Sequence, residues 1–144
     1  MNFADRRRLL APCGMDCAVC SAYLAYAHGV PKQRGAISHC AGCRARNKRC
    51  AWLKGHCGRL GPGGFNYCFE CPDYPCAHLQ HLDRRYRTSY RMSLIENLER
   101  IRQAGAAAFI RAQQSRFGCP QCGGLRSVHN RKCFACNPVR SWRA

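Results

Sequence analysis

The strongest chemical pattern in the chain is a pair of cysteine knuckles near the carboxyl terminus. Cys119-Pro120-Gln121-Cys122-Gly123 is followed, after a basic segment, by Cys133-Phe134-Ala135-Cys136-Asn137. In such a knuckle the proline restricts one backbone dihedral, and the residue after the second cysteine allows a left-handed turn that aims amides at the sulfurs. Thiolates from both knuckles suit a tetrahedral zinc ion. The pattern therefore predicts a zinc ribbon with the ligands Cys119, Cys122, Cys133 and Cys136, which a rubredoxin-type iron ion would also use.

The other ten of the 14 cysteines lie in the first 76 residues. An even number also suits a disulfide framework. The first ten residues, however, contain no apolar run like the core of a secretory signal. We therefore expect a cytoplasmic protein, in which metal sites are favoured over disulfides. The predicted metal ligands of this region are Cys13, Cys17, Cys20, Cys40, Cys43, Cys50, Cys57, Cys68, Cys71 and Cys76.

The spacing of these ligands leaves the metal and the grouping open. The triplet of Cys13, Cys17 and Cys20 has the spacing of proteins in which three thiolates hold a four-iron, four-sulfur cluster, so an iron-sulfur cluster is the alternative to zinc. With zinc throughout, we expect about two to four ions. One grouping places Cys40, Cys43, Cys50 and Cys57 together and completes the triplet with Cys68, Cys71 or Cys76. Another adds a third site completed by His39 or His78, or shares bridging thiolates, and any extra cysteine could be a buried thiol.

The elements that must position these cysteines are predicted to be mainly helical before the ribbon. Asp16 is a candidate N-cap for a helix over 17–28, which would place Cys17 and Cys20 on one face. A second helix is expected to start at Pro75, beside Cys76. Further helical segments follow a capping box at 93–96 and a break at 105.

The expected fold class is a small, metal-stabilised α+β protein. Cysteine clustering divides the chain into a Cys-rich, irregular and helical module (1–83), a helical connector (84–117) and a β zinc ribbon (118–144). Pieces of this size rarely fold on a hydrophobic core alone, so bound metal would supply much of their stability.

The charge of the chain is strongly positive, with 24 Lys and Arg against 7 Asp and Glu and a formal net charge of +17. No acidic residue lies between Asp16 and Glu70, or after Glu99. Such a field attracts polyanions, of which nucleic acid is the commonest, although a merely soluble arginine-rich surface is the alternative. The predicted nucleic-acid contacts are Arg44, Arg46, Lys48, Arg49, Arg84, Arg85, Arg87, Arg126, Arg131 and Lys132.

The order of cysteines over residues 12 to about 80 resembles the bacterial and archaeal domain-of-unknown-function family numbered 3795. The resemblance implies a small Cys-rich metal-binding domain, with a ribbon-bearing extension in some members, and it supplies no activity. The matching residues are Cys13, Gly14, Cys17, Cys20, Ala22, Tyr23, Cys40, Gly42, Cys43, Cys50, Cys57, Cys68, Glu70, Cys71, Pro75 and Cys76.

No arrangement of residues in the sequence indicates catalysis, because the carboxylates are scattered and the histidines lack the paired spacing of a catalytic zinc site. No stretch approaches the length of a membrane span, so no membrane partner is expected. The preferred hypothesis is a zinc-binding, non-catalytic protein that contacts RNA or DNA, within a ribonucleoprotein or alone. The alternatives are an iron-sulfur redox or metal-handling protein and a scaffold whose ribbon binds another protein.

Overall fold

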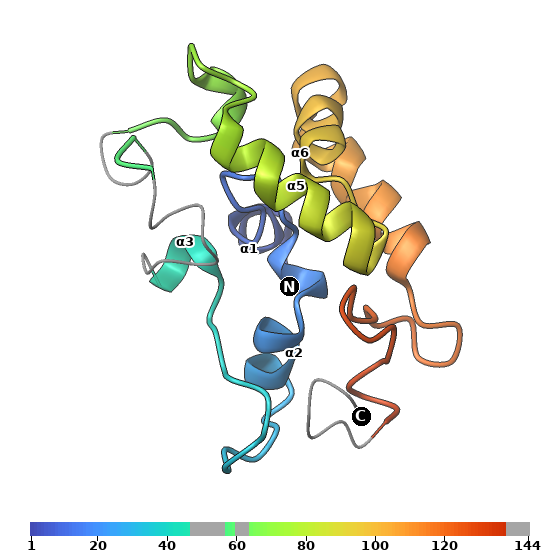
Figure 1. Ribbon diagram of the computed structural model, residues 1–144. Helices are drawn as coiled ribbons and strands as arrows, with labels where there is room; N and C mark the ends of the chain where they lie inside the picture. Colours follow the sequence, from blue (N-terminus) through green and yellow to red (C-terminus); the bar gives the residue numbers. More distant parts are fainter. Residues whose placement is uncertain (47–56, 60–63, 138–144) are drawn as a thin grey trace.

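The computed structural model describes residues 1–46, 57–59 and 64–137. Figure 1 shows two long helices beside each other, with the N-terminal segments behind them and to one side. Across the described residues no helix is both long and apolar enough to cross a bilayer. The elements are α1 (Phe3–Arg8), the 3-10 turn η1 (Cys17–Val19), α2 (Ser21–Ala27), α3 (Cys43–Arg46), the 3-10 turn η2 (Cys68–Glu70), α5 (Ala77–Tyr90) and α6 (Leu94–Phe117).

The helix α6 is the central support of the fold, because it packs against α5, α1 and η2. Ser93 is the N-cap of α6, as expected, and its hydroxyl accepts a hydrogen bond of 3.1 Å from the amide of Glu96, which is one of the two bonds of the expected capping box. The predicted break is also present: Gly105 has φ 86° and ψ 163°, so α6 is kinked there. Leu94, Leu98 and Phe109, on both sides of the kink, are buried.

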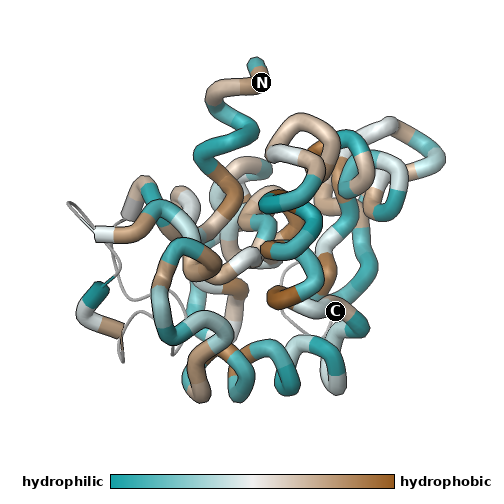
Figure 2. The backbone as a smooth tube through the Cα atoms, turned by 90° about the horizontal axis from the view of Figure 1, so that it is seen from above, coloured by the Kyte–Doolittle hydropathy of each residue, from teal (hydrophilic) through white to brown (hydrophobic). Residues whose placement is uncertain are grey.

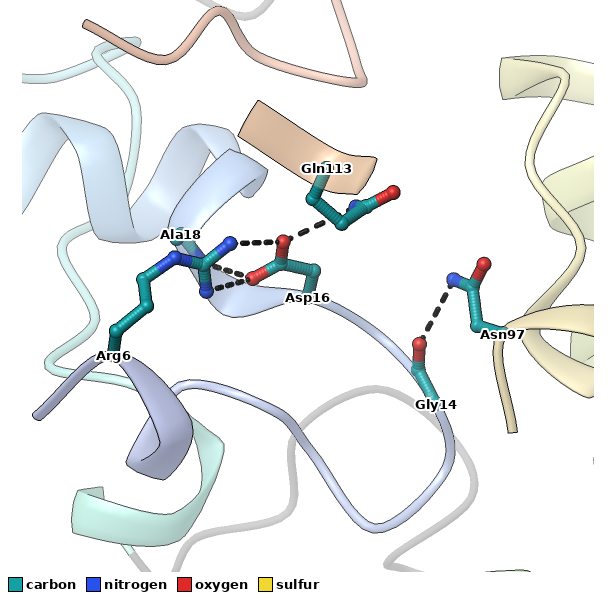
Figure 3. Close-up of polar contacts among 6 residues, drawn as sticks. All are labelled: Arg6, Gly14, Asp16, Ala18, Asn97 and Gln113. Carbon is teal, nitrogen blue, oxygen red and sulfur yellow. Dashed lines mark hydrogen bonds and ion pairs between the residues drawn. The ribbon is translucent and has the colours of Figure 1, made fainter. Parts of the chain in front are cut away.

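A buried carboxylate joins the N-terminal segment to α6 (Figure 3). Asp16 is fully buried, and its two oxygens accept hydrogen bonds of 2.7 and 2.6 Å from the guanidinium of Arg6 on α1. The amide of Ala18 and the side-chain nitrogen of Gln113 on α6 each donate to it at 3.1 Å. A buried charge is tolerated only when it is paired and hydrogen-bonded, so these contacts hold three parts of the chain in one arrangement.

A second contact brings the same loop onto the start of α6. The side chain of Asn97 donates a hydrogen bond of 2.9 Å to the carbonyl of Gly14 (Figure 3). Gly14 has φ +89°, and a Cβ atom there would lie 2.3 Å from the carbonyl oxygen of Leu94. Only glycine accommodates both this backbone conformation and this close approach.

Residues from all three predicted segments of the chain contribute to one hydrophobic core. Leu10 and Val19 from the N-terminal part pack with Leu79 of α5, Leu98 of α6 and Val128 of the ribbon. Figure 2 shows most hydrophobic stretches of the backbone towards the middle of the molecule and hydrophilic stretches on the outer turns. The ribbon is therefore packed onto the helices, while the domain boundaries at 83 and 117 stay predictions.

The expected helix over 17–28 is wrong in its first turn. Asp16 caps only the short 3-10 turn η1, and Cys20 is extended, with φ −81° and ψ 131°. The α-helix α2 starts after it, at Ser21, so Cys17 and Cys20 do not share a helix face. The tight turn forms because the amide of Cys20 donates to the carbonyl of Cys17 at 3.0 Å.

The β part of the expected α+β class is also wrong for the described residues, which are mostly helical and contain no β-sheet. The ribbon has only isolated antiparallel bridges, Gly118 with Leu125 and Arg126 with Cys133. The amide of Val128 donates to the carbonyl of Val19 at 2.8 Å, outside the ribbon, so it is not available to extend a hairpin ladder.

We predict that replacing the buried carboxylate destabilises the protein far more than replacing an exposed one. Asp16→Ala would leave Arg6 and Gln113 without their acceptor and lower the free energy of unfolding by about 3 to 5 kcal/mol. The control is Asp5→Ala, which removes an exposed carboxylate 4.0 Å from Arg8 and should cost less than about 1 kcal/mol. Urea unfolding at a constant zinc concentration measures both, and equal losses would contradict the role assigned to Asp16.

Candidate metal centre

The described part of the chain contains one group of cysteines whose sulfurs all lie within 4.8 Å of one another, and it is the predicted ribbon site. The Sγ atoms of Cys119 and Cys136 are 3.9 Å apart, and those of Cys122 and Cys133 are 3.5 Å apart. A tetrahedral zinc ion with Zn–S bonds of about 2.3 Å separates its sulfurs by about 3.8 Å. The four residues therefore fit a metal ion in both donor type and spacing.

The backbone of the first knuckle prepares the site for thiolates. Gly123 has φ 75°, and its amide donates to the carbonyl of Cys119 at 2.8 Å. The backbone amides of Cys122 and Gln121 point at the sulfur of Cys119 and lower its pKa to about 7. The amide of Gly124 approaches the sulfur of Cys122 at 3.4 Å. The predicted role of the glycine turn, to aim amides at the sulfurs, is thus present in the fold.

In the second knuckle, the pKa of Cys136 is shifted in the opposite direction to that of Cys119. The hydrogen bond with Cys122, followed by burial, raises the pKa of Cys136 to about 12. Asn137 closes this knuckle, since its backbone amide and its side-chain nitrogen donate to the carbonyl of Cys133 at 3.0 and 2.9 Å. Crowded sulfurs of this kind resist losing all their protons unless a cation is present, which is the property expected of a metal centre.

The segment between the knuckles is fixed to the N-terminal part of the chain. The hydroxyls of Ser21 and Ser127 are 2.6 Å apart and buried, and the amide of Ser21 donates to Nδ1 of His129 at 3.2 Å. The ring of His129 also packs edge-on against Tyr90, with ring centres 4.7 Å apart. Burial lowers the pKa of His129 to about 4. His129 is therefore a neutral, half-buried packing residue, and it is outside the ribbon group.

The N-terminal cysteines fall into different sets from those of the first predicted grouping. The sulfurs of Cys17 and Cys43 are 3.2 Å apart and buried. Cys57 instead lines a small cavity with Cys68, Cys71 and Cys76. Of the remaining predicted ligands, Cys13 and Cys20 pack against the main core, Cys40 is half-buried, and Cys50 lies outside the described residues.

The thiol of Cys68 is the most deeply placed in that cavity. Burial, with the neighbouring sulfurs of Cys57, Cys76 and Cys71, raises its pKa to about 12. Arg59 also lines this cavity, and its guanidinium donates to the sulfur of Cys71 at 3.2 Å.

Four of the predicted nucleic-acid contacts have side chains that already bond within the protein. Arg44 donates to the carbonyl of Leu10 at 2.7 Å and to Asn66 at 2.8 and 2.9 Å. Arg87 pairs with the buried Asp83 at 2.8 Å. Arg131 donates to the carbonyl of Tyr90 at 2.5 Å, and Arg126 donates to that of Arg116 at 3.4 Å. Among the ten residues, Arg84, Arg85, Arg131 and Lys132 are exposed and Arg126 is half-buried, whereas the side chain of Arg46, and Lys48 and Arg49 altogether, lie outside the described residues.

Two arginines that the sequence analysis did not select lie next to Arg131. Arg91, in the turn after α5, and Arg116, in the last turn of α6, line an open groove of about 540 Å³ together with Arg131. Arg91 lies close in the chain to the predicted contacts Arg84, Arg85 and Arg87, with Tyr86 and Tyr90 between them, so composition could have suggested it. Nothing in the sequence indicates that these three residues, 25 and 15 positions apart, meet in space.

The family described as "Protein of unknown function (DUF3795)" matches residues 9–81. This range includes the N-terminal cysteines, and it confirms the resemblance inferred from their order. The ribbon lies outside it. No curated protein and no solved structure matches the chain.

We predict that the ribbon binds one metal ion and that this binding requires the two exposed cysteines, Cys122 and Cys136. The double variant Cys122→Ser with Cys136→Ser should purify with about one zinc ion fewer per chain than the unaltered protein, because two thiolates cannot complete a tetrahedral site. The control Lys132→Ala changes the same hairpin without removing sulfur and should keep the full zinc content. Elemental analysis measures all three proteins, and an unchanged zinc content in the double variant would contradict the site.

The low pKa of Cys119 predicts a pH-dependent release of protons when zinc binds. Below pH 7 this thiol carries its proton in the metal-free protein, and at pH 8 it is mainly a thiolate. Zinc binding to the ribbon should therefore release about one proton more from Cys119 at pH 6 than at pH 8. Zinc titration calorimetry in buffers of different ionisation enthalpy measures the protons released, and subtracting the values for the Cys122, Cys136 double variant isolates the ribbon. Release of as many protons or more at pH 8 than at pH 6 would contradict the assignment.

Proposed function

The chain belongs to the DUF3795 family, whose description assigns no function, and we propose that it is a zinc-binding, non-catalytic protein that binds nucleic acid through an arginine-rich surface. The single observation that carries this proposal is the groove between the end of α5, the end of α6 and the tip of the ribbon hairpin. Three arginines line it, and none of its lining residues is acidic.

The chemistry of the groove suits a phosphate backbone with exposed bases. Arg91, Arg116 and Arg131 provide planar guanidinium groups, which pair with phosphate through two parallel hydrogen bonds. Tyr90 lies on the same lining and offers an aromatic face for stacking.

The electrostatics of the groove favour an anion. Burial, followed by the charges of Arg116, Arg91 and Arg126, lowers the pKa of Arg131. These cations repel one another, and a phosphate among them would turn repulsion into attraction.

The metal would act as a rigid support in this proposal. The ribbon carries Arg126 and Arg131 between its two knuckles, so a metal ion that joins the knuckles restricts where these arginines can lie. Arg116 precedes Cys119 by three positions at the end of α6. The groove and the metal centre therefore share one piece of backbone, and loss of the ion should weaken nucleic-acid binding.

The metal that we propose for the ribbon is zinc, which forms closed structural sites with four thiolates, although a rubredoxin-type iron ion uses the same ligands. An iron-sulfur redox or metal-handling protein would instead purify with iron and visible charge-transfer absorption. Elemental analysis of anaerobically purified protein separates the two.

We predict that removing the groove arginines weakens binding to nucleic acid and makes the binding constant less sensitive to salt concentration. In the triple variant Arg91→Gln, Arg116→Gln and Arg131→Gln, about three phosphate contacts are lost, so the slope of log K against log salt should become shallower by about 2 to 3. The probes are a fluorescent single-stranded RNA and a duplex DNA, each titrated at several salt concentrations.

The matched control removes three arginines that are paired with carboxylates elsewhere. Arg8, Arg100 and Arg102 pair with Asp5, Glu96 and Glu99. Changing all three to Gln lowers the net charge by the same amount and should leave the slope within about one unit of the original. Equal slopes for the two triple variants, or a flat salt dependence of the unaltered protein, would refute the proposed function.

A further inference from the structure

The cavity beneath the start of α5 is lined by cysteines from separate parts of the chain. Cys57 follows a segment outside the described residues, Cys68 and Cys71 flank the turn η2, and Cys76 is the N-cap of α5. We propose that this cavity is a second metal site, distinct from the ribbon, in which these four cysteines bind one zinc ion. The inference does not depend on nucleic-acid binding.

The donor set of the cavity selects a soft cation. Apart from the cysteines, its lining consists of Arg59, Phe65, Tyr74 and Leu79, and it contains no carboxylate and no histidine. Thiolate ligands without oxygen donors favour zinc, copper(I) or iron-sulfur clusters over magnesium or calcium. The cavity has a volume of about 30 Å³, which suits a single ion rather than a cluster of several iron and sulfide ions.

The backbone around the cavity presents its cysteines as a knuckle and a helix start. The amide of Cys71 donates to the carbonyl of Cys68 at 3.1 Å, which closes a short turn between two potential ligands. The sulfur of Cys76 accepts a hydrogen bond of 3.4 Å from the amide of Leu79, in the first turn of the 14-residue helix α5. The positive end of a helix stabilises a thiolate, so Cys76 is placed as an anionic ligand.

Arg59 supplies charge compensation for such a site. Zinc bound by four thiolates carries a net charge of about −2. The guanidinium of Arg59 contacts the sulfur of Cys71 at 3.2 Å, and it also pairs with Asp73 at 2.7 Å. Hydrogen bonds from outer residues to ligating atoms orient the ligands and offset their charge, and this contact has that geometry.

Binding would draw the ligands of the cavity inward. Among the described residues only the ribbon group has all its sulfurs within 4.8 Å, so those of the cavity are more widely spaced. Around a tetrahedral zinc ion they would approach to about 3.8 Å. Cys57 lies outside any helix or turn, whereas Cys68, Cys71 and Cys76 are held at the ends of such elements. We expect Cys57 to make the largest movement.

The grouping differs from the one that sequence spacing first suggested. In that grouping Cys57 joined Cys40 and Cys43, but the sulfur of Cys43 is 3.2 Å from that of Cys17. The proposed site therefore combines cysteines on both sides of the glycine-rich stretch at 58–64. Spacing along the sequence would instead assign the cysteines before and after this stretch to different metal sites.

The first test removes two ligands that are only half-buried, so that folding is disturbed as little as possible. The full chain with Cys57→Ser and Cys71→Ser, purified with zinc chloride present and then desalted, should contain one zinc ion fewer per chain than the unaltered protein. Phe65→Leu is the control, because it changes the wall of the same cavity without removing sulfur, and it should keep the full zinc content. Equal zinc contents in all three proteins, measured by elemental analysis, would overturn the proposal.

A second test uses the unaltered protein and so does not depend on how a variant folds. With zinc bound, alkylation followed by mass spectrometry should find Cys57, Cys68, Cys71 and Cys76 protected together. After treatment with a zinc chelator, the half-buried Cys57, Cys71 and Cys76 should become labelled, and the buried Cys68 should follow more slowly. Labelling of Cys57 and Cys71 at the same rate before and after chelation would overturn the proposal, as would a disulfide among the four. Neither readout involves nucleic acid, so failure here is distinguishable from failure of the proposed function.

Discussion

The buried pair of Asp16 and Arg6 is the constraint on which the rest of the structure depends. A carboxylate removed from water must find several donors, and here they come from α1, from η1 and from Gln113 of α6. The adjoining loop with Cys13 and Gly14 is held on the start of α6 by the hydrogen bond from Asn97 to the carbonyl of Gly14, and Cys17 directly follows Asp16. The N-terminal cysteines Cys13 and Cys17 are thus placed by the polar contacts of the core.

The excess of arginine in this chain serves two different purposes. Arg6, Arg44 and Arg59 are donors to a buried carboxylate, to carbonyl oxygens and to a cysteine sulfur, so part of the positive charge belongs to the interior and its edges. In the groove near Arg131 no lining residue is a carboxylate, and Arg116 and Arg131 donate instead to the carbonyls of Arg91 and Tyr90. Net charge alone cannot separate these cases, since a guanidinium neutralised by a carboxylate and one bonded to a carbonyl oxygen have the same formal charge.

The ribbon joins the metal chemistry to both the core and the groove. Val128 belongs to the main hydrophobic core, and the buried hydroxyls of Ser21 and Ser127 meet across the junction. The knuckles lie on either side of these contacts, and the groove lies at the tip of the same hairpin. A metal ion in the ribbon would therefore restrict a segment that is already anchored at its centre, which makes the position of Arg131 sensitive to both packing and metal.

The sequence by itself determined the local features whose physics involves neighbouring residues: the knuckle turns, the capping box before α6, the break at Gly105 and the order of cysteines that identifies the family. It also placed Cys119, Cys122, Cys133 and Cys136 in one site, because two short knuckles leave few other ways to satisfy a tetrahedral ion. Only the tertiary structure decided that the described ribbon has no strand ladder and that the sulfurs of Cys17 and Cys43 lie together. It also decided that Cys57 lines one cavity with the cysteines around η2. The meeting of Arg91, Arg116 and Arg131 in one groove was likewise decided by packing. These outcomes depend on contacts between residues far apart in the chain, and such contacts are set by how helices pack rather than by spacing along the sequence.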